Sequence, residues 1–110
     1  MKRNPDGELL HGNAETLVLA VLARGESHGY QLRKDLAIRS KSLFHIGFGR
    51  LYPLLALLER RGQARARWMN AGPVRQRKIY AITAKGRAHL QEKKRKWRQF
   101  SAAMERVLSK

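Results

Sequence analysis

The sequence predicts a mainly α-helical fold with one two-stranded β-hairpin and a long C-terminal helix. Apolar residues recur at helical spacing before residue 62, alternate along residues 64–82, and recur at helical spacing again from residue 84. A chain of 110 residues, of which 43% are hydrophobic, suits one domain of ordinary composition.

Three helices are predicted in the first half of the chain, over residues 14–23, 28–37 and 49–61. The first is apolar at nearly every position from Leu17 to Leu22, which is typical of a buried helix, although a short strand remains the alternative. Gly25 is expected to adopt the left-handed conformation just past this helix, and Ser27 to cap the second helix. In the third, a leucine stripe recurs at i, i+4 and i+7, and Gly62 is the expected end. The stripe consists of Leu51, Leu55 and Leu58.

A hairpin is predicted between residues 64 and 82. Ala64, Ala66 and Trp68 alternate with Arg65, Arg67 and Met69, which indicates a half-buried strand. The segment Asn70-Ala71-Gly72-Pro73 has the composition of a turn, and residues 76–82 form the expected returning strand.

The last helix is predicted to begin after a Thr83 cap and to run to about Ser109. Its apolar residues fit a heptad stripe that Lys93 interrupts. The stripe consists of Leu90, Trp97, Phe100, Met104 and Val107. We expect no later element to cover these side chains, so the helix is expected to pair with another chain or to fold back.

Three helices followed by a basic hairpin is the element order of a winged helix-turn-helix, in which the third helix enters the major groove and the hairpin, or wing, lies along the DNA backbone. We therefore expect a DNA-binding domain over residues 1–83 and a dimerisation helix over residues 84–110.

The positive charge is concentrated in the second half of the chain. The formal net charge is +16, of which residues 1–59 supply +2 and residues 60–110 supply +14. An excess of this size predicts a polyanionic partner. No cysteine is present, which excludes a disulfide scaffold, a zinc ribbon and a thiol nucleophile. No apolar run reaches the length of a membrane span, and no signal peptide is expected at residues 1–7, so we expect a cytoplasmic, nucleoid-associated protein.

The sequence resembles the PadR family of bacterial transcriptional regulators from Leu9 to Leu108. No single phrase decides this, but the ordered set is specific. The matching phrases are Leu19-Ala20-Val21-Leu22-Ala23, His28-Gly29-Tyr30, Gly49-Arg50-Leu51-Tyr52-Pro53-Leu54-Leu55, Leu58-Glu59-Arg60-Arg61-Gly62, Trp68, Arg77-Lys78-Ile79-Tyr80, Thr83-Ala84-Lys85-Gly86, and Trp97 with Phe100. The chain departs from the family pattern at Gly47, where a Ser or Thr often caps the recognition helix, and at Arg50, where a small hydroxyl residue is usual.

The resemblance implies the short form of the family, a homodimeric repressor of a palindromic operator, with one C-terminal dimerisation helix. In some members a small aromatic ligand binds at the dimer interface and releases the DNA. By this resemblance and by their charge, the candidate DNA-binding residues are Tyr30, Arg50, Tyr52, Arg75, Arg77 and Lys78. The candidate ligand or dimer-interface residues are Trp97, Phe100 and Met104.

Several alternatives stay open at this point. Tyr30 and Tyr52 could be core residues, and Trp97 could pack in a dimer seam without binding ligand. The cluster Lys93-Lys94-Arg95-Lys96 could face solvent or extend the DNA footprint. A small ribosome-associated RNA-binding protein is the main alternative function, and association with a membrane surface through the basic last helix is another. The four histidines match no metal-ligand spacing and no catalytic motif is present, so no cofactor and no enzymatic activity are expected.

Overall fold

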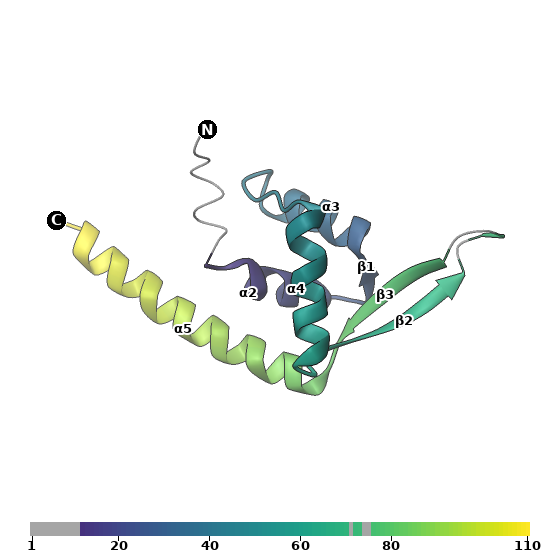
Figure 1. Ribbon diagram of the computed structural model, residues 1–110. Coiled ribbons are helices and arrows are strands. Elements are labelled where there is room, and N and C mark those ends of the chain that lie inside the picture. Colours follow the sequence, from purple (N-terminus) through teal and green to yellow (C-terminus); the bar gives the residue numbers. More distant parts are fainter. Residues whose placement is uncertain (1–11, 71, 74–75) are drawn as a thin grey trace.

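The computed structural model describes residues 12–70, 72–73 and 76–110, and these residues form four helices and three strands (Figure 1). In chain order the elements are α2 (Ala14–Leu22), β1 (Ser27–His28), α3 (Gly29–Arg39), α4 (Phe48–Arg60), β2 (Ala64–Asn70), β3 (Gln76–Ile82) and α5 (Ala84–Leu108). The predicted mainly helical fold with a long C-terminal helix is confirmed.

Helices α2, α3 and α4 pack around one apolar core. The leucine stripe of α4, Leu51, Leu55 and Leu58, is fully buried, as its spacing predicts. Leu19 of α2 is fully buried too, and residues 14–22 form a helix rather than the alternative strand. Leu90 belongs to the same cluster, so the first turns of α5 are part of the body of the protein.

Two predicted helix ends are wrong. Gly25 has no positive φ, and α2 ends instead through Ala23, which keeps right-handed helical backbone angles. Ser27 belongs to β1, and the cap of α3 is His28, whose Nδ1 accepts a hydrogen bond from the backbone N–H of Gln31 at 3.3 Å. The usual cap signal is a short side chain with an oxygen acceptor, so a histidine cap is not apparent from sequence.

The other two predicted helix ends are confirmed. Gly62 follows α4 with φ of +73°. The Thr83 hydroxyl accepts a hydrogen bond from the N–H of Gly86 at 3.0 Å and donates one to the carbonyl of Gly62 at 2.6 Å. These bonds join the end of α4 directly to the start of α5.

The sheet has three antiparallel strands in the order β1-β3-β2, not the predicted two. β2 and β3 form the predicted hairpin, with Ala64 opposite Ile82 and Asn70 opposite Gln76. β1 pairs with the other side of β3, where Ser27 lies opposite Tyr80. A strand of two residues is too short to produce a recognisable alternation, which is why the sequence does not predict it.

The hairpin is buried only where it leaves the body, which corrects the prediction of a half-buried strand. Ala64 is 4% exposed, whereas Trp68 on the same face is 63% exposed. The outer part of the hairpin extends beyond the helices (Figure 1), so the alternation continues where no core covers it.

α5 also extends away from the body (Figure 1). Its buried residues are Gly86 and Leu90, near its start. Trp97 and Phe100 are 53% and 63% exposed, and Met104 and Val107 are exposed as well. Leu90, the first residue of the predicted heptad stripe, is part of the core, and from Trp97 onward the stripe is an uncovered apolar face of a long helix. Within the described ranges, no helix is long and apolar enough to cross a membrane.

Candidate nucleic-acid interface

A hollow of about 660 Å³ lies between the start of α3, the first turns of α4 and the hairpin. Four of the predicted DNA-binding residues line it together: Tyr30, Tyr52, Arg77 and Lys78. Trp68 and Tyr80 of the hairpin contribute further aromatic surface. Lysine, arginine and tyrosine side chains are among the groups that contact the phosphates of duplex DNA. Arg75 lies outside the described residues.

Tyr30 and Tyr52 are surface residues, which excludes the alternative that they belong to the core. Tyr30 is 57% exposed and Tyr52 is 46% exposed, whereas Tyr80 is 4% exposed. The Tyr52 ring stacks on Phe48 with 5.5 Å between ring centroids. A Cβ at Gly29 would approach the Tyr52 hydroxyl to 2.8 Å, so the glycine at the start of α3 allows this ring to lie against the backbone.

Arg77 is held beside the N-terminus of α3. Its Nη1 lies 3.0 Å from Nε2 of His28, while Nδ1 of the same ring caps α3. A neutral imidazole accepts at only one nitrogen, so the two contacts are alternatives rather than simultaneous hydrogen bonds. Burial, and then the charge of Arg77, lower the pKa of His28. A neutral His28 leaves the positive charge of Arg77 uncompensated at the edge of the hollow.

Lys78 differs from Arg77 because a carboxylate neutralises it. Its Nζ lies 3.0 Å from Oε1 of Glu59 on α4, and 5.8 Å and 5.5 Å from the ring centroids of Trp68 and Tyr80. The hydrogen bond to Glu59 raises the pKa of Lys78. A second pair, Arg67 with Glu26 at 2.6 Å, ties β2 to the body. The sequence does not predict either acidic partner, because the positions of Glu26 and Glu59 along the chain give no sign that these residues contact the hairpin.

We expect Glu59→Gln to strengthen binding to duplex DNA of any sequence, because it frees the Lys78 ammonium. The salt slope, log K against log salt concentration, should steepen by up to about 0.9, the value of one phosphate contact. Fluorescence anisotropy over a salt series measures both quantities. Glu92→Gln is the matched control, since it makes the same charge change at a residue that pairs with Arg95 within α5. An equal gain in affinity for duplex DNA in the two variants would contradict the release of the Lys78 ammonium.

The start of α4 is fixed by a neighbouring helix. Gly47 is its N-cap, and no side chain caps the helix. Arg33 of α3 donates from Nε to the carbonyl of Ile46 at 2.7 Å, and its guanidinium lies 4.3 Å from the centroid of the Phe48 ring. Arg50 lies in the first turn, which contains no acidic residue, so the helix dipole and the side chain both favour an anion there. Arg50 does not line the hollow.

A second, more apolar hollow of about 380 Å³ lies between α2 and α5. It is lined by Leu17, Ala20, Phe44 and Trp97, with Lys94 and Arg98 beside them. Of the predicted ligand residues only Trp97 lines it; Phe100 and Met104 do not.

The basic cluster at residues 93–96 does not act as one unit. Lys94 lines the apolar hollow, Arg95 pairs with Glu92, and Lys96 is exposed.

The comparisons with known proteins fit this geometry. Residues 18–92 match the family model described as the transcriptional regulator PadR-like family. The chain belongs to this family. Members are transcriptional regulators, which indicates DNA-binding regulation rather than catalysis and gives the RNA-binding alternative no support.

Solved structures of PadR-family regulators have the same fold. A PadR family transcriptional regulator from Eggerthella lenta is 33% identical, with a TM-score of 0.79 over 93% of this chain and 83% of that one. A PadR-like transcriptional regulator from Bacillus cereus is 26% identical, with a TM-score of 0.79 over 94% of this chain and 98% of that one. An uncharacterised protein of Lysinibacillus sphaericus is 24% identical over 90 residues, which are 82% of this chain and 83% of the relative.

Proposed function

We propose that this PadR-like protein is a homodimeric repressor that binds a palindromic operator. Residues 1–83 form the DNA-binding domain, with α4 as the recognition helix, and residues 84–110 form the dimerisation helix. The main support for the proposal is that Tyr30, Tyr52, Arg77 and Lys78 line one hollow beside the start of α4. A protein with this role acts on the chromosome, so the nucleoid is the expected location.

Within this interface Arg77 is proposed as the phosphate contact of the wing, and Lys78 as a residue that holds the wing against α4. The basis is the different partners, a neutral imidazole for Arg77 and a carboxylate for Lys78. Arg77→Ala should reduce the salt slope by about 0.9 on operator and scrambled DNA alike. Lys78→Ala should reduce the salt slope by clearly less than Arg77→Ala does. Anisotropy titrations at several salt concentrations test this, and equal slopes for Arg77→Ala and the wild type would exclude a backbone contact.

The uncovered apolar face of α5 supports the dimer. Trp97, Phe100 and Val107 are 53%, 63% and 82% exposed on a helix that leaves the body. An apolar stripe at heptad spacing is stabilised when a second helix covers it. Two copies joined through α5 would present two recognition helices to half-sites one or more helical turns apart.

The hollow beside Trp97 supports the proposed effector. It offers an indole ring and aliphatic walls, and Lys94 and Arg98 favour a ligand that carries a carboxylate. We therefore propose a small aromatic carboxylate that releases the protein from DNA.

Trp97→Ala should abolish binding of aromatic carboxylates, because it removes the stacking surface. The chain has two tryptophans, so Trp68→Phe leaves Trp97 as the only indole and its fluorescence quenching reports the ligand directly. The Trp68→Phe variant should retain binding. Calorimetric binding that survives in Trp97→Ala would place the effector site elsewhere.

A further inference from the structure

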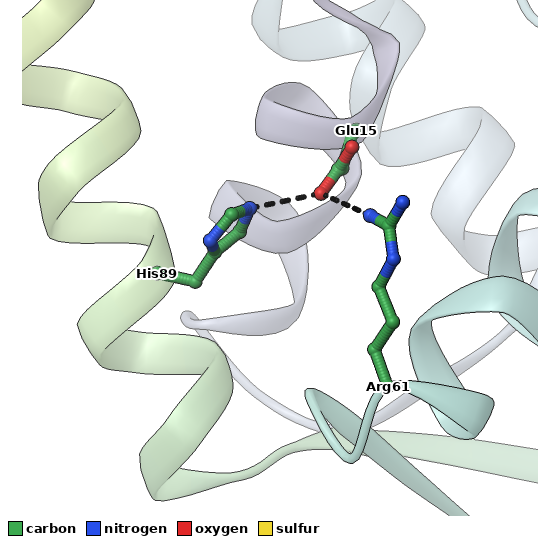
Figure 2. A network of polar contacts seen from close by, with 3 residues as sticks. All are labelled: Glu15, Arg61 and His89. Atoms are coloured by element: carbon green, nitrogen blue, oxygen red, sulfur yellow. Dashed lines mark hydrogen bonds and ion pairs between the residues drawn. The ribbon is translucent and has the colours of Figure 1, made fainter.

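A network of three side chains joins the base of α5 to the end of the recognition helix (Figure 2). Glu15 lies in the first turn of α2. Its Oε1 accepts a hydrogen bond from Nη1 of Arg61 at 3.1 Å and lies 2.9 Å from Nε2 of His89. Arg61 is the residue directly after α4, and His89 lies in the second turn of α5. One carboxylate oxygen therefore contacts both helices.

A small change in the direction of α5 at its base produces a large displacement at its far end. Gly86 and Leu90 are the buried residues of this helix, and beyond Lys94 each residue is exposed or partly exposed. From Leu90 to Val107 the helix rises by about 26 Å, at ~1.5 Å per residue. A tilt of about 10° at the base would displace the far end by roughly 4–5 Å over that length. The direction of α5 at its base thus sets where the apolar stripe lies relative to α4.

The other polar contacts at this base leave that tilt less constrained. Thr83 bonds to Gly62 at the very start of α5, which fixes the point from which the helix leaves the body. His89 lies about 9 Å further along the helix, at ~1.5 Å per residue. Its contact with Glu15 therefore restrains the direction of the α5 axis. Arg87 contacts the carbonyl of Ala23 only at 3.5 Å, the limit for a hydrogen bond.

We propose that Glu15 is a positioning residue that sets the direction of α5 relative to α4, and through it the half-site spacing that the dimer prefers. In a dimer joined by α5, the tilt of each arm determines the separation of the two recognition helices. The inference rests on the proposed dimeric function. Glu15 lies outside the residues 18–92 that the family model matches, so family membership does not supply this contact.

A distance measurement tests the physical part of the proposal. The chain has no cysteine, so Arg65→Cys, at an exposed position on β2, introduces one spin label per protomer. Double electron–electron resonance on the DNA-free dimer should give one narrow distance distribution. Glu15→Ala should broaden or shift it by several ångströms, the displacement expected from the length of α5 beyond its base. Glu15→Gln keeps an acceptor oxygen and should stay close to the wild type.

Two further variants distinguish the positioning role of Glu15 from a general destabilisation of the fold. Glu92→Ala removes a carboxylate that pairs within α5 and should leave the distribution unchanged. His89→Ala should reproduce the Glu15→Ala change, and the double variant should add little, because both variants remove the contact between Glu15 and His89. A distribution that Glu15→Ala leaves unchanged overturns the proposal. The absence of any intermolecular distance in the wild type overturns the dimer and the proposal with it.

A spacing selection tests the functional part. Half-sites found for the wild type are placed in duplexes with spacers that differ by single base pairs. Glu15→Ala should lower the preference for the best spacer over its neighbours by about two- to fivefold, the range of a partly exposed ion pair, with binding to one half-site unchanged. An equal loss of affinity at every spacer indicates structural damage alone and overturns the inference. A wild type that selects no paired half-sites overturns the proposed function itself.

Discussion

Gly86→Ala is expected to destabilise the protein by about 2–4 kcal/mol, although alanine is the better helix former. A Cβ at this position would lie 2.8 Å from Cγ1 of Ile82 and far inside the contact distance of the Gln63 carbonyl oxygen. That oxygen accepts the N–H of Thr83 at 3.1 Å, so any shift that makes room breaks the joint between α4 and α5. Thermal unfolding at fixed protein concentration should show a decrease in Tm of roughly 10 °C or more.

Gly49→Ala is the matched control for that prediction. Gly49 also lies in a helix, α4, but a Cβ at this position would have no atom within 4 Å apart from those of its chain neighbours and of the nearby backbone of its own helix. The substitution should be neutral or stabilise by up to about 1 kcal/mol, the propensity difference alone. A Gly86→Ala protein as stable as Gly49→Ala would show that α5 does not pack against the turn at Gln63.

Phe100→Glu is expected to separate the dimer and to weaken operator binding by about 10²–10⁴-fold. This is the range by which the affinity of two linked DNA-binding domains exceeds that of a single domain. Phe100 is 63% exposed at the middle of the α5 stripe, where a charge would oppose burial against a second helix. Light scattering should give the mass of one chain, with the helix content retained. Affinity for a single half-site should stay near that of the wild-type protomer.

Ala102→Glu provides the control for charge. Ala102 is exposed and lies two residues further along, about 200° around the helix and away from the stripe. Its substitution changes the net charge equally and should leave the dimer intact. Dissociation of both variants to the same extent would show that the apolar face is not the dimer interface.

The sequence predicted the elements that repeat a pattern over several turns. The stripe Leu51, Leu55 and Leu58 placed α4, and the Thr83 cap placed the start of α5 to within one residue. The sequence does not predict β1, because two residues show no periodicity, and it predicts the cap of α3 one residue early, because His28 is an unusual acceptor. The exposure of Trp68 was missed because alternation does not show where the body ends.

The site was predicted as a set of residues and not as a set of contacts. Tyr30, Tyr52, Arg77 and Lys78 meet at one hollow, as the winged-helix order implies. The pairing of Lys78 with Glu59 joins residues 19 positions apart on different elements, and that of Glu15 with His89 joins residues 74 apart. Such contacts depend on helix packing, for which sequence spacing carries no signal. In the proposed interface these contacts determine which cation is available to DNA, and in the proposed dimer they determine the direction of α5.

Selection of bound duplexes from random DNA at physiological salt measures directly whether a dimer of this protein recognises a specific sequence. If the dimer reads two half-sites, a palindrome should be enriched whose half-sites are about 10 base pairs, or a multiple of that, apart from centre to centre. Recovered duplexes with no shared sequence, bound as tightly as the starting pool, would contradict sequence-specific recognition by the dimer.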